Sequence, residues 1–526
     1  MKIVKITLIS SIVSLNLMAM DLGSVMTSVV RTNPKVIQKK KEYNSVYETL
    51  KISQGDFFLP SIDLSASLNK VKTKYKEPAE DDAESTNRSL TLSITENLFN
   101  GFGTVNDIDA KKAALASKAF SYLQTVNEEA LKASKVYLDL ARHKEMLNIE
   151  LDSFYKHKKI LEAVKARSLA GVGVVGDLQE IVAKTNLAYA NYVAESKNLK
   201  ASQIAMNKLL GRPIDANSVS VLTTVGENLS YSLSQAINFA LTHNPTIFVQ
   251  KYNVIQARYN QKRDEKEFLP KIDLTVAKQY RDGIDDNTGI ERKLENLSGG
   301  ISLNWNLFRG FKDVHQKRKN ISLIHVEQEK YNAIKRDLIE EIELAWMSYK
   351  MQEKEYNYLS NYVKNADAKL QTNAKLFQIG KKSLFEYLSS QTDFNSAKEK
   401  LINSKYDLLF AKLRVLKALG VLIDMVDPGI KREVGVVSDG LHDYEAMAYT
   451  PDTLPVREDT INQNGSFSLN DIIGFDSYKI VSPVKRSYNI NTNCKTYYNY
   501  NSNSNNSKFY DEEYVAPRTT RRRYGR

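Results

Sequence analysis

An internal duplication constrains this chain more than any other feature of its sequence. The motif Phe-Leu-Pro-x-Ile-Asp-Leu occupies residues 58–64 and returns at 268–274. The motif Asn-Leu-Phe-x-Gly-Phe occupies 97–102 and returns at 306–311, and an Asn-Pro step recurs in the same order. The offset, about 210 residues, is far longer than the period of solenoid or propeller repeats. The sequence therefore predicts two tandem copies of one domain, not an array.

The two ends of the chain differ from the repeats. A basic start, an apolar run from Ile6 to Met18 and the small residue Ala19 indicate a cleaved secretory signal. A membrane anchor is the alternative, but the run is shorter than the roughly 20 residues that span a bilayer. The Asn/Ser/Tyr-rich run over 487–507 cannot bury a core and indicates flexibility. We divide the chain into a signal peptide (1–19), a first repeat (20–212), a second repeat (213–425) and a largely flexible C-terminal extension (426–526).

Each repeat contains two stretches in which apolar and polar residues alternate, a pattern typical of a strand with one apolar and one polar face. Polar loops, from Pro78 to Glu84 and from Asp282 to Gly289, separate the two stretches. The sequence thus predicts a β-hairpin over about 61–99 and another over about 271–308. The apolar positions are Ile62, Leu64, Ala66, Leu68, Leu90, Leu92 and Ile94 in the first repeat and Ile272, Leu274, Val276, Ile301, Leu303, Trp305 and Leu307 in the second.

The rest of each repeat is predicted to be helical and long. No Pro or Gly occurs from Val105 to Arg167, and a helix of that length would extend about 90 Å. Steps of three and four residues mark an apolar face for pairing with a second helix. The predicted fold class is mainly α with a small β part, made of coiled-coil helical hairpins and four strands. The pairing positions are Ala188, Tyr192, Leu199, Met206 and Leu209 in the first repeat and Phe394, Ala397, Leu401, Ser404, Leu408, Ala411, Val415 and Ala418 in the second.

The composition argues against an enzyme and against a bound cofactor or metal. The single cysteine, Cys494, excludes an internal disulfide and a multi-cysteine metal site. The sequence has no glycine-rich phosphate loop, and no acid-base pair stands out from the helical charge pattern. The net charge of +12 is compatible with nucleic acid, but export argues against that partner. The histidines have no metal-ligand spacing; they are His143, His157, His243, His315, His325 and His442.

The predicted hairpins pose a problem of unpaired edges. Four strands leave two open edges, and hydrocarbon tolerates only closed barrels because each unpaired backbone group there costs several kcal/mol. If the apolar faces contact lipid, several protomers must combine their strands into one barrel with a polar lumen. The alternative is a soluble strand pair that packs on helices.

The paired motifs resemble those of the TolC family of outer-membrane channel proteins, over about residues 21–425. The resemblance implies a homotrimer whose strands close one 12-stranded barrel in outer-membrane lipid, with the helices forming a periplasmic tunnel. It implies a passive exit duct that docks with a periplasmic adaptor and an inner-membrane ABC or proton-driven transporter. The stretch over 97–104 favours type I protein secretion, with multidrug efflux as the alternative. A periplasmic coiled-coil scaffold without a pore is the alternative function from a different functional class.

The resemblance also suggests a gate at the periplasmic tips of the helical hairpins. Gly171 and Gly380 lie in the two turns, and Asp177 and Lys382 match the acid and base whose bridge helps to close the family's entrance. Glu386 and Ser389 match positions where selective members carry two aspartate rings, so only the Glu386 ring is expected here. Read from the residues alone, Asp177 is equally suited to capping a helix.

Four residues are predicted to form the passages between helix and strand. Pro60 and Pro270 stop a helix before a strand begins, and Gly101 and Gly310 allow a tight turn from strand to helix. Phe99, Trp305 and Phe308 lie beside these passages. They are candidates for an aromatic girdle at the membrane interface, or for ordinary packing at the junction.

Overall fold

The computed structural model describes residues 20–74, 83–171, 174–221, 229, 232–285 and 289–435 of the protomer. The predicted signal peptide, all but the first ten residues of the predicted C-terminal extension, and two residues of the first tip turn lie outside this part. No helix that the structure describes has the length and apolar character needed to cross a membrane.

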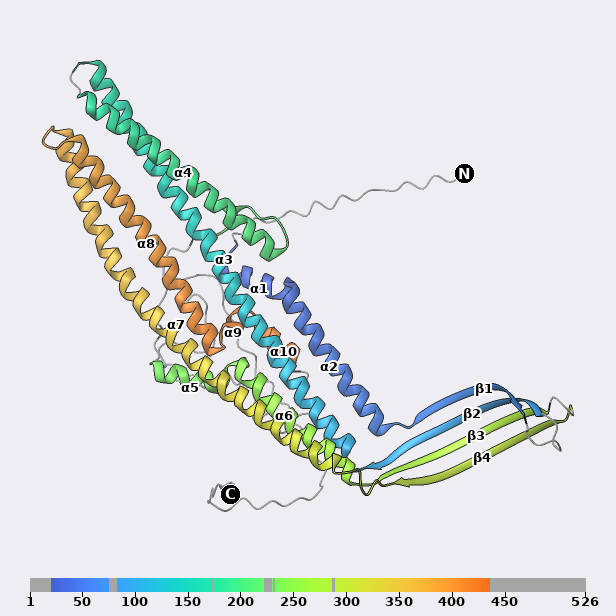
Figure 1. Ribbon diagram of the computed structural model, residues 1–526. Helices are drawn as coiled ribbons and strands as arrows, with labels where there is room; N and C mark the ends of the chain where they lie inside the picture. Colours follow the sequence, from blue (N-terminus) through green and yellow to red (C-terminus); the bar gives the residue numbers. More distant parts are fainter. Residues whose placement is uncertain are drawn as a thin grey trace, which may run out of the picture. The chain divides into compact units, whose positions relative to one another are not determined.

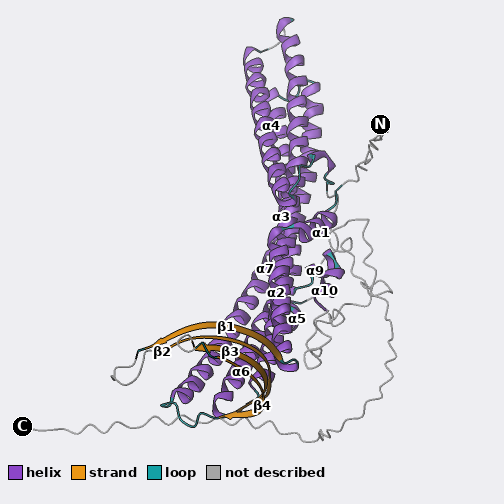
Figure 2. Cartoon of the chain, turned by 90° about the vertical axis from the view of Figure 1, so that its right-hand side faces the viewer, coloured by secondary structure: helices purple, strands orange, loops and turns teal. Residues whose placement is uncertain are grey.

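Helices make up most of the described chain, and the four strands form one curved sheet (Figure 2). Figure 1 labels the α-helices and strands along the chain. They are α1 (Leu22–Thr32), α2 (Pro34–Phe58), β1 (Ser61–Thr73), β2 (Ala83–Asn100), α3 (Gly103–Leu169), α4 (Val175–Leu210), η1 (Ala216–Ser218), α5 (Leu233–His243), α6 (Pro245–Asp264), η2 (Glu265–Phe268), β3 (Lys271–Asp285), β4 (Glu291–Asn304), α7 (Lys312–Gln378), α8 (Leu384–Leu419), α9 (Leu422–Val426) and α10 (Pro428–Gly435).

The element order shows the duplication directly. The series α2, β1, β2, α3, α4 recurs as α6, β3, β4, α7, α8, and α3 and α7 each contain 67 residues. At 1.5 Å per residue each of these helices is about 100 Å long. Helices α3 and α4 pack together as one hairpin, and α7 and α8 as another (Figure 1). The prediction of long paired helices and four strands is confirmed.

Both hairpins belong to one antiparallel sheet with strand order β1-β2-β3-β4. The strands extend further into the predicted loops than expected, since Glu84 lies in β2 and Asp282 lies in β3. At the other end, the prediction of a strand through about residue 308 is wrong for the single protomer, in which β4 stops at Asn304. Its pairing with β3 ends there, at Lys271 opposite Asn304, and no strand of the described residues pairs with the residues that follow.

The core lies where α3 packs against several other helices. Tyr137 of α3 is fully buried, and its hydroxyl donates to the backbone oxygens of Met20 and Ser220 at 3.1 and 2.9 Å. On α8 every predicted pairing position except the half-buried Leu401 is buried. Of the predicted pairing positions on α4 only Ala188 and Met206 are buried, because α4 packs mainly on α3 whereas α8 packs on both α7 and α3.

The repeated Asn-Pro step has a structural explanation. Asn33 and Asn244 are N-caps, each accepting a hydrogen bond from the second residue of the following helix, and each helix starts with proline. The side-chain amides reach further into the molecule. Asn33 donates to the Glu129 carboxylate at 2.8 Å, and Asn244 donates to the Ala418 carbonyl at 2.7 Å. The step therefore both starts a helix and ties it to a neighbour.

Candidate functional site

The four-stranded sheet has one apolar and one polar face. Cross-strand partners lie on the same face, so Ile62, Ile94 and Val276 form one apolar row. On the other face Ser67 and Ser89 are joined at 2.9 Å by a hydrogen bond between their hydroxyls. Every residue of β1 and β4 is exposed, since the protomer covers neither the two faces nor the two edge strands. The sheet is therefore suited to separate an apolar environment from a polar one.

The apolar band crosses the sheet obliquely. On β1 the band extends from Ile62 to Leu68. Followed across β2 and β3, the registers place these two residues level with residues 299 and 293 of β4. The apolar positions of β4 are instead Leu297 to Leu303, four residues further along. Four residues span about 14 Å, and three strand spacings also span about 14 Å. A band parallel to a membrane plane therefore requires strands tilted by roughly 45°, the tilt of membrane barrels.

The passages from strand to helix depend on left-handed backbone. Gly101 and Gly310 have φ values of +62° and +60°, and the phenylalanines that follow them have the same sign. Gly101 lies so close to the segment before β3 that an added Cβ would be 2.8 Å from Leu269 Cβ. Pro60 and Pro270 each immediately precede a strand. The four residues stand at the predicted passages.

Aromatic side chains surround these passages more extensively than predicted. Phe99 and Phe308 each pack edge-on against the phenylalanine three residues later, with ring centroids 5.3 Å apart in both cases. Trp305 is exposed and donates to the Phe268 carbonyl at 3.3 Å. Five exposed phenylalanines beside the passages were not predicted, although the repeated motifs contain four of them. They are Phe57, Phe58, Phe102, Phe268 and Phe311.

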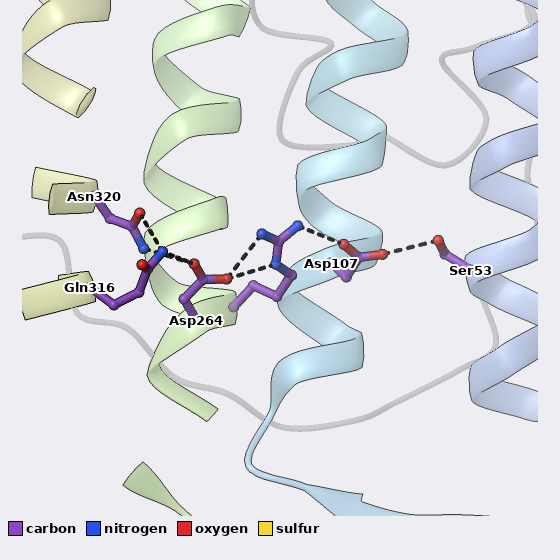
Figure 3. Close-up of polar contacts among 6 residues, drawn as sticks. Ser53, Asp107, Asp264, Gln316 and Asn320 are labelled. Carbon is purple, nitrogen blue, oxygen red and sulfur yellow. Dashed lines mark hydrogen bonds and ion pairs between the residues drawn. The ribbon is translucent and has the colours of Figure 1, made fainter. Parts of the chain in front are cut away.

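A polar network joins four helices close to the passages. Arg263 of α6 connects two carboxylates, donating to Asp107 at 3.2 Å and to Asp264 at 3.0 Å. Burial alone would raise the pKa of Asp264, but hydrogen bonds from Asn320, Arg263 and Gln316 outweigh it and lower that pKa. The network fixes α2, α3, α6 and α7 relative to one another. It consists of Ser53, Asp107, Arg263, Asp264, Gln316 and Asn320 (Figure 3).

The second tip, the turn between α7 and α8, is stabilised by contacts among its own residues. Ser383 caps α8 in a capping box, in which its hydroxyl accepts from the Glu386 backbone N–H at 3.2 Å and its backbone N–H donates to the Glu386 carboxylate at 3.1 Å. Lys382 forms an ion pair with the same carboxylate. These contacts lower the pKa of Glu386, the Lys382 hydrogen bond most strongly. Gly380 turns the chain with φ +75°, and Ser389 is exposed one turn further on.

At the first tip, between α3 and α4, the described residues form no such capping box. Helix α4 starts at Val175 with Val174 as its N-cap, and no side chain caps it. The prediction that Asp177 caps the helix is wrong, because Asp177 lies in the first turn, at the position that Glu386 occupies in α8. Gly171 turns the chain with φ +74°. Among the described residues Lys382 pairs with Glu386 and not with Asp177, so the protomer does not bring the predicted gate pair together.

Buried acids lie where α3, α4 and α8 meet. His143 and Glu195 are joined at 2.7 Å, and Asn395 donates to the Ser153 hydroxyl at 2.9 Å. Burial raises the pKa of Glu150 to about 7, and the nearby Glu399 contributes. These groups do not form a metal site, and across the described ranges no cluster of three or more His, Cys, Asp or Glu side chains is arranged to hold a metal ion.

Comparison with known proteins identifies the family. The model of the outer membrane efflux protein family matches residues 33–212 and 236–421, more than half of the chain. The chain is 22% identical over 369 residues to the outer membrane efflux protein BepC of Brucella suis, covering 69% of this chain and 77% of BepC. It is 28% identical over 176 residues to the proteases secretion protein PrtF of Dickeya chrysanthemi, covering 32% and 37%.

The fold has a counterpart among solved structures. The Campylobacter jejuni CmeC outer membrane channel superposes with a TM-score of 0.66 at 17% identity, covering 80% of this chain and 89% of CmeC. The predicted fold class, long helical hairpins with four strands, is therefore shared with a solved outer-membrane channel. On the family match and this fold, the chain belongs to the outer membrane efflux protein family.

Proposed function

We propose that the protein is a passive exit duct in the outer membrane, formed by three copies of the chain. The observation that carries the proposal is the four-stranded sheet, with one apolar face, one polar face and two unpaired edges. Three copies would supply the 12 strands of one closed barrel, whose apolar band faces lipid and whose polar face lines the lumen. The oblique band supports this arrangement, because it fits strands tilted as in a membrane barrel.

The helical hairpins would form a tunnel in the periplasm and meet the other components at their tips. An inner-membrane transporter, of ABC or proton-driven type, would load substrate, and a periplasmic adaptor would hold the two together. The duct itself performs no chemistry in this proposal. The family is one of transport proteins, which supports a channel and disfavours both an enzyme and a scaffold without a pore.

For the exported substrate we favour protein through a type I secretion system. The motif over 97–104 is the feature that led to this choice, and a relative named for protease secretion supports it. Small-molecule efflux is the second candidate, supported by a relative named for efflux that matches a larger share of the chain.

The proposed gate uses charges from the two tips. Lys382 is held by Glu386 within the protomer, so closure would require Lys382 to exchange that carboxylate for Asp177 of a neighbouring copy. Because both partners are carboxylates, Lys382 could exchange one for the other and keep an ion pair in each state. Once Lys382 has left for Asp177, three Glu386 side chains in one narrow entrance would focus negative potential and favour cations.

Planar bilayers test the duct and the gate together. The detergent-purified protein is expected to be a trimer by mass and to open small, cation-preferring channels. Replacing Asp177 and Lys382 with alanine should increase single-channel conductance, whereas Lys369→Ala, which removes an ion pair between α7 and α8, should not. A monomer without conductance would overturn the duct. Unchanged conductance in the Asp177/Lys382 variant would remove only the gate.

A further inference from the structure

We propose that β4 pairs with β1 of a second copy in the same register that joins β2 to β3 within the chain. The inference rests on the trimer of the proposed function and adds its interface, residue by residue. The duplication supplies the template. Within the chain, β2 of the first repeat meets β3 of the second; between chains, β4 of the second repeat would meet β1 of the next first repeat.

The register follows from counterpart positions. Thr95 lies opposite Thr275 within the chain. In the aligned motifs the counterpart of Thr95 is Asn304, and the counterpart of Thr275 is Ser65. Asn304 is therefore assigned to lie opposite Ser65 of the second copy.

The lengths of the strands support this assignment. The β1–β2 ladder begins at Ser61 opposite Thr95, yet β2 continues to Asn100 because β3 pairs with the extra residues. Strand β4 ends at Asn304, the counterpart of Thr95, where β3 also ends its pairing. Residues 305–309 are the counterparts of 96–100, but in the described part of the protomer no strand pairs with them. A second copy would extend β4 through them.

A side-chain contact at the internal seam has unpaired counterparts at the two edges. The Asn97 amide donates to the Asp273 carboxylate at 2.7 Å. The counterparts are Asn306 and Asp63, from the same repeated motifs. Both are exposed, and neither side chain has a hydrogen bond among the residues described. Across the proposed seam Asn306 would donate to Asp63 of the second copy.

The glycines at the strand ends show the same asymmetry. An added Cβ on Gly101 would be 2.8 Å from Leu269, whereas an added Cβ on Gly310 meets nothing within 4 Å in the described protomer. The backbone is the same, with φ +62° and +60°. The counterpart of Leu269 is Leu59, which is 68% exposed. Leu59 of the second copy would cover Gly310.

The apolar face provides a check that was not used to derive the register. The internal pairs Glu96–Leu274, Ile94–Val276 and Leu92–Lys278 become Trp305–Leu64, Leu303–Ala66 and Ile301–Leu68 across the seam. All three pairs between copies are apolar, so the lipid-facing band is continuous. A slip of two residues in one direction would place Lys70 beside Ile301. A slip in the other direction, which places Ser302 opposite Ser65, keeps the band apolar but separates Asn306 from Asp63. A head-to-tail contact of this kind gives a ring when its rotation closes, as the proposed trimer requires.

Cysteine cross-linking tests the register. In a Cys494→Ser background, Ser65→Cys with Asn304→Cys should give a disulfide-linked ladder ending at trimer on a non-reducing gel. The matched control, Thr95→Cys with Thr275→Cys, should oxidise within one chain and give no ladder, since directly opposed strand residues lie at disulfide distance. Ser65→Cys with Ser302→Cys is two residues out of register and should remain largely reduced.

An exchange of the polar pair gives a second readout. Asn306→Asp would place two carboxylates together and should lower the temperature at which the trimer dissociates in detergent. Adding Asp63→Asn restores one donor and one acceptor and should recover most of that loss. A trimer that cross-links at 65 and 302 but not at 65 and 304, or a double variant no more stable than Asn306→Asp, would overturn the seam while leaving the duct intact. A detergent monomer would instead overturn the duct.

Discussion

The two repeats share their element order and the lengths of their paired helices, yet the longest helix of each is buried to a very different extent. Helix α3 has 24 buried residues and α7, of the same 67-residue length, has eight. Helix α3 packs between α2 and α6 and against α8, whereas α7 has α6 and α8 as its main neighbours and leaves one side open. Ile321, Leu323 and Val326 are exposed on α7 near the strand junction. Within the protomer, the long helix of the first repeat is largely covered, whereas the long helix of the second repeat has an exposed apolar surface.

The largest predicted effect tests this difference in burial. Leu140 of α3 is fully buried, so Leu140→Ala should destabilise the protomer by about 2–5 kcal/mol through the cavity that it creates. Leu323→Ala on α7 removes the same atoms from a side chain that is 47% exposed. Its protomer should unfold at an almost unchanged temperature, measured by circular dichroism in detergent.

The same pair of variants separates folding from assembly. If the open side of α7 contacts a second copy, Leu323→Ala should lower the temperature of trimer dissociation on a semi-native gel. If Leu323→Ala lowers protomer stability as much as Leu140→Ala, or has no effect on the trimer, the comparison between the two helices fails.

A smaller effect is expected from the buried acids, which occur beside α3 and have no counterpart on α7. Glu150 matches Leu359 in the second repeat. Burial, and next the charge of Glu399, raise the pKa of Glu150 from 4.5 to about 7. Because the folded state favours the protonated acid, this group's stabilising contribution is present below pH 4.5. It is lost as the pH rises through 7.

Glu150→Gln should therefore flatten the loss of stability between pH 4.5 and 7 and increase stability at pH 8, by about 1–2 kcal/mol. The groups near Glu150 are Glu399, Glu195 and Asn191, and His143 contacts Glu195. Glu162→Gln, further along α3, is the matched control and should leave the pH profile unchanged. An equal pH slope in the Glu150→Gln protein would show that another group is responsible.

The sequence predicted most of the fold because the duplication made each observation count twice. Paired Leu-Pro and Phe-x-Gly-Phe steps marked all four strands, and the heptad positions of α8 matched its buried side. The errors lie where one repeat departs from the other. Capping of α4 by Asp177 was one of two roles left open, and it fails because the counterpart of the Ser383–Glu386 capping box is Val174 with Asp177, in which the cap position holds valine.

The end of β4 could not be predicted from local pattern. Trp305 and Leu307 continue the alternation of the strand, but a strand also needs a neighbour, and β3 ends its pairing at Asn304. The aromatic pairs were missed for a related reason. Phe102 and Phe311 follow glycines with positive φ, and only the resulting turn brings each ring against the phenylalanine three residues earlier.

The smallest predicted effect concerns the two tips, where the repeats differ in capping. Ser383→Ala removes the side-chain cap of α8 and should cost about 1 kcal/mol, seen as faster amide hydrogen exchange in its first turn. The reverse change, Val174→Ser with Asp177→Glu, copies the capping box into α4 and should slow exchange there by a similar free energy. Val174→Ala is the matched control without a cap. If the copied box slows exchange at α4 and also lowers the open probability in bilayers, the uncapped first tip is the part that yields when the entrance opens. If exchange slows while gating is unchanged, the tips differ in stability alone, and the asymmetry between repeats matters for assembly and not for the gate.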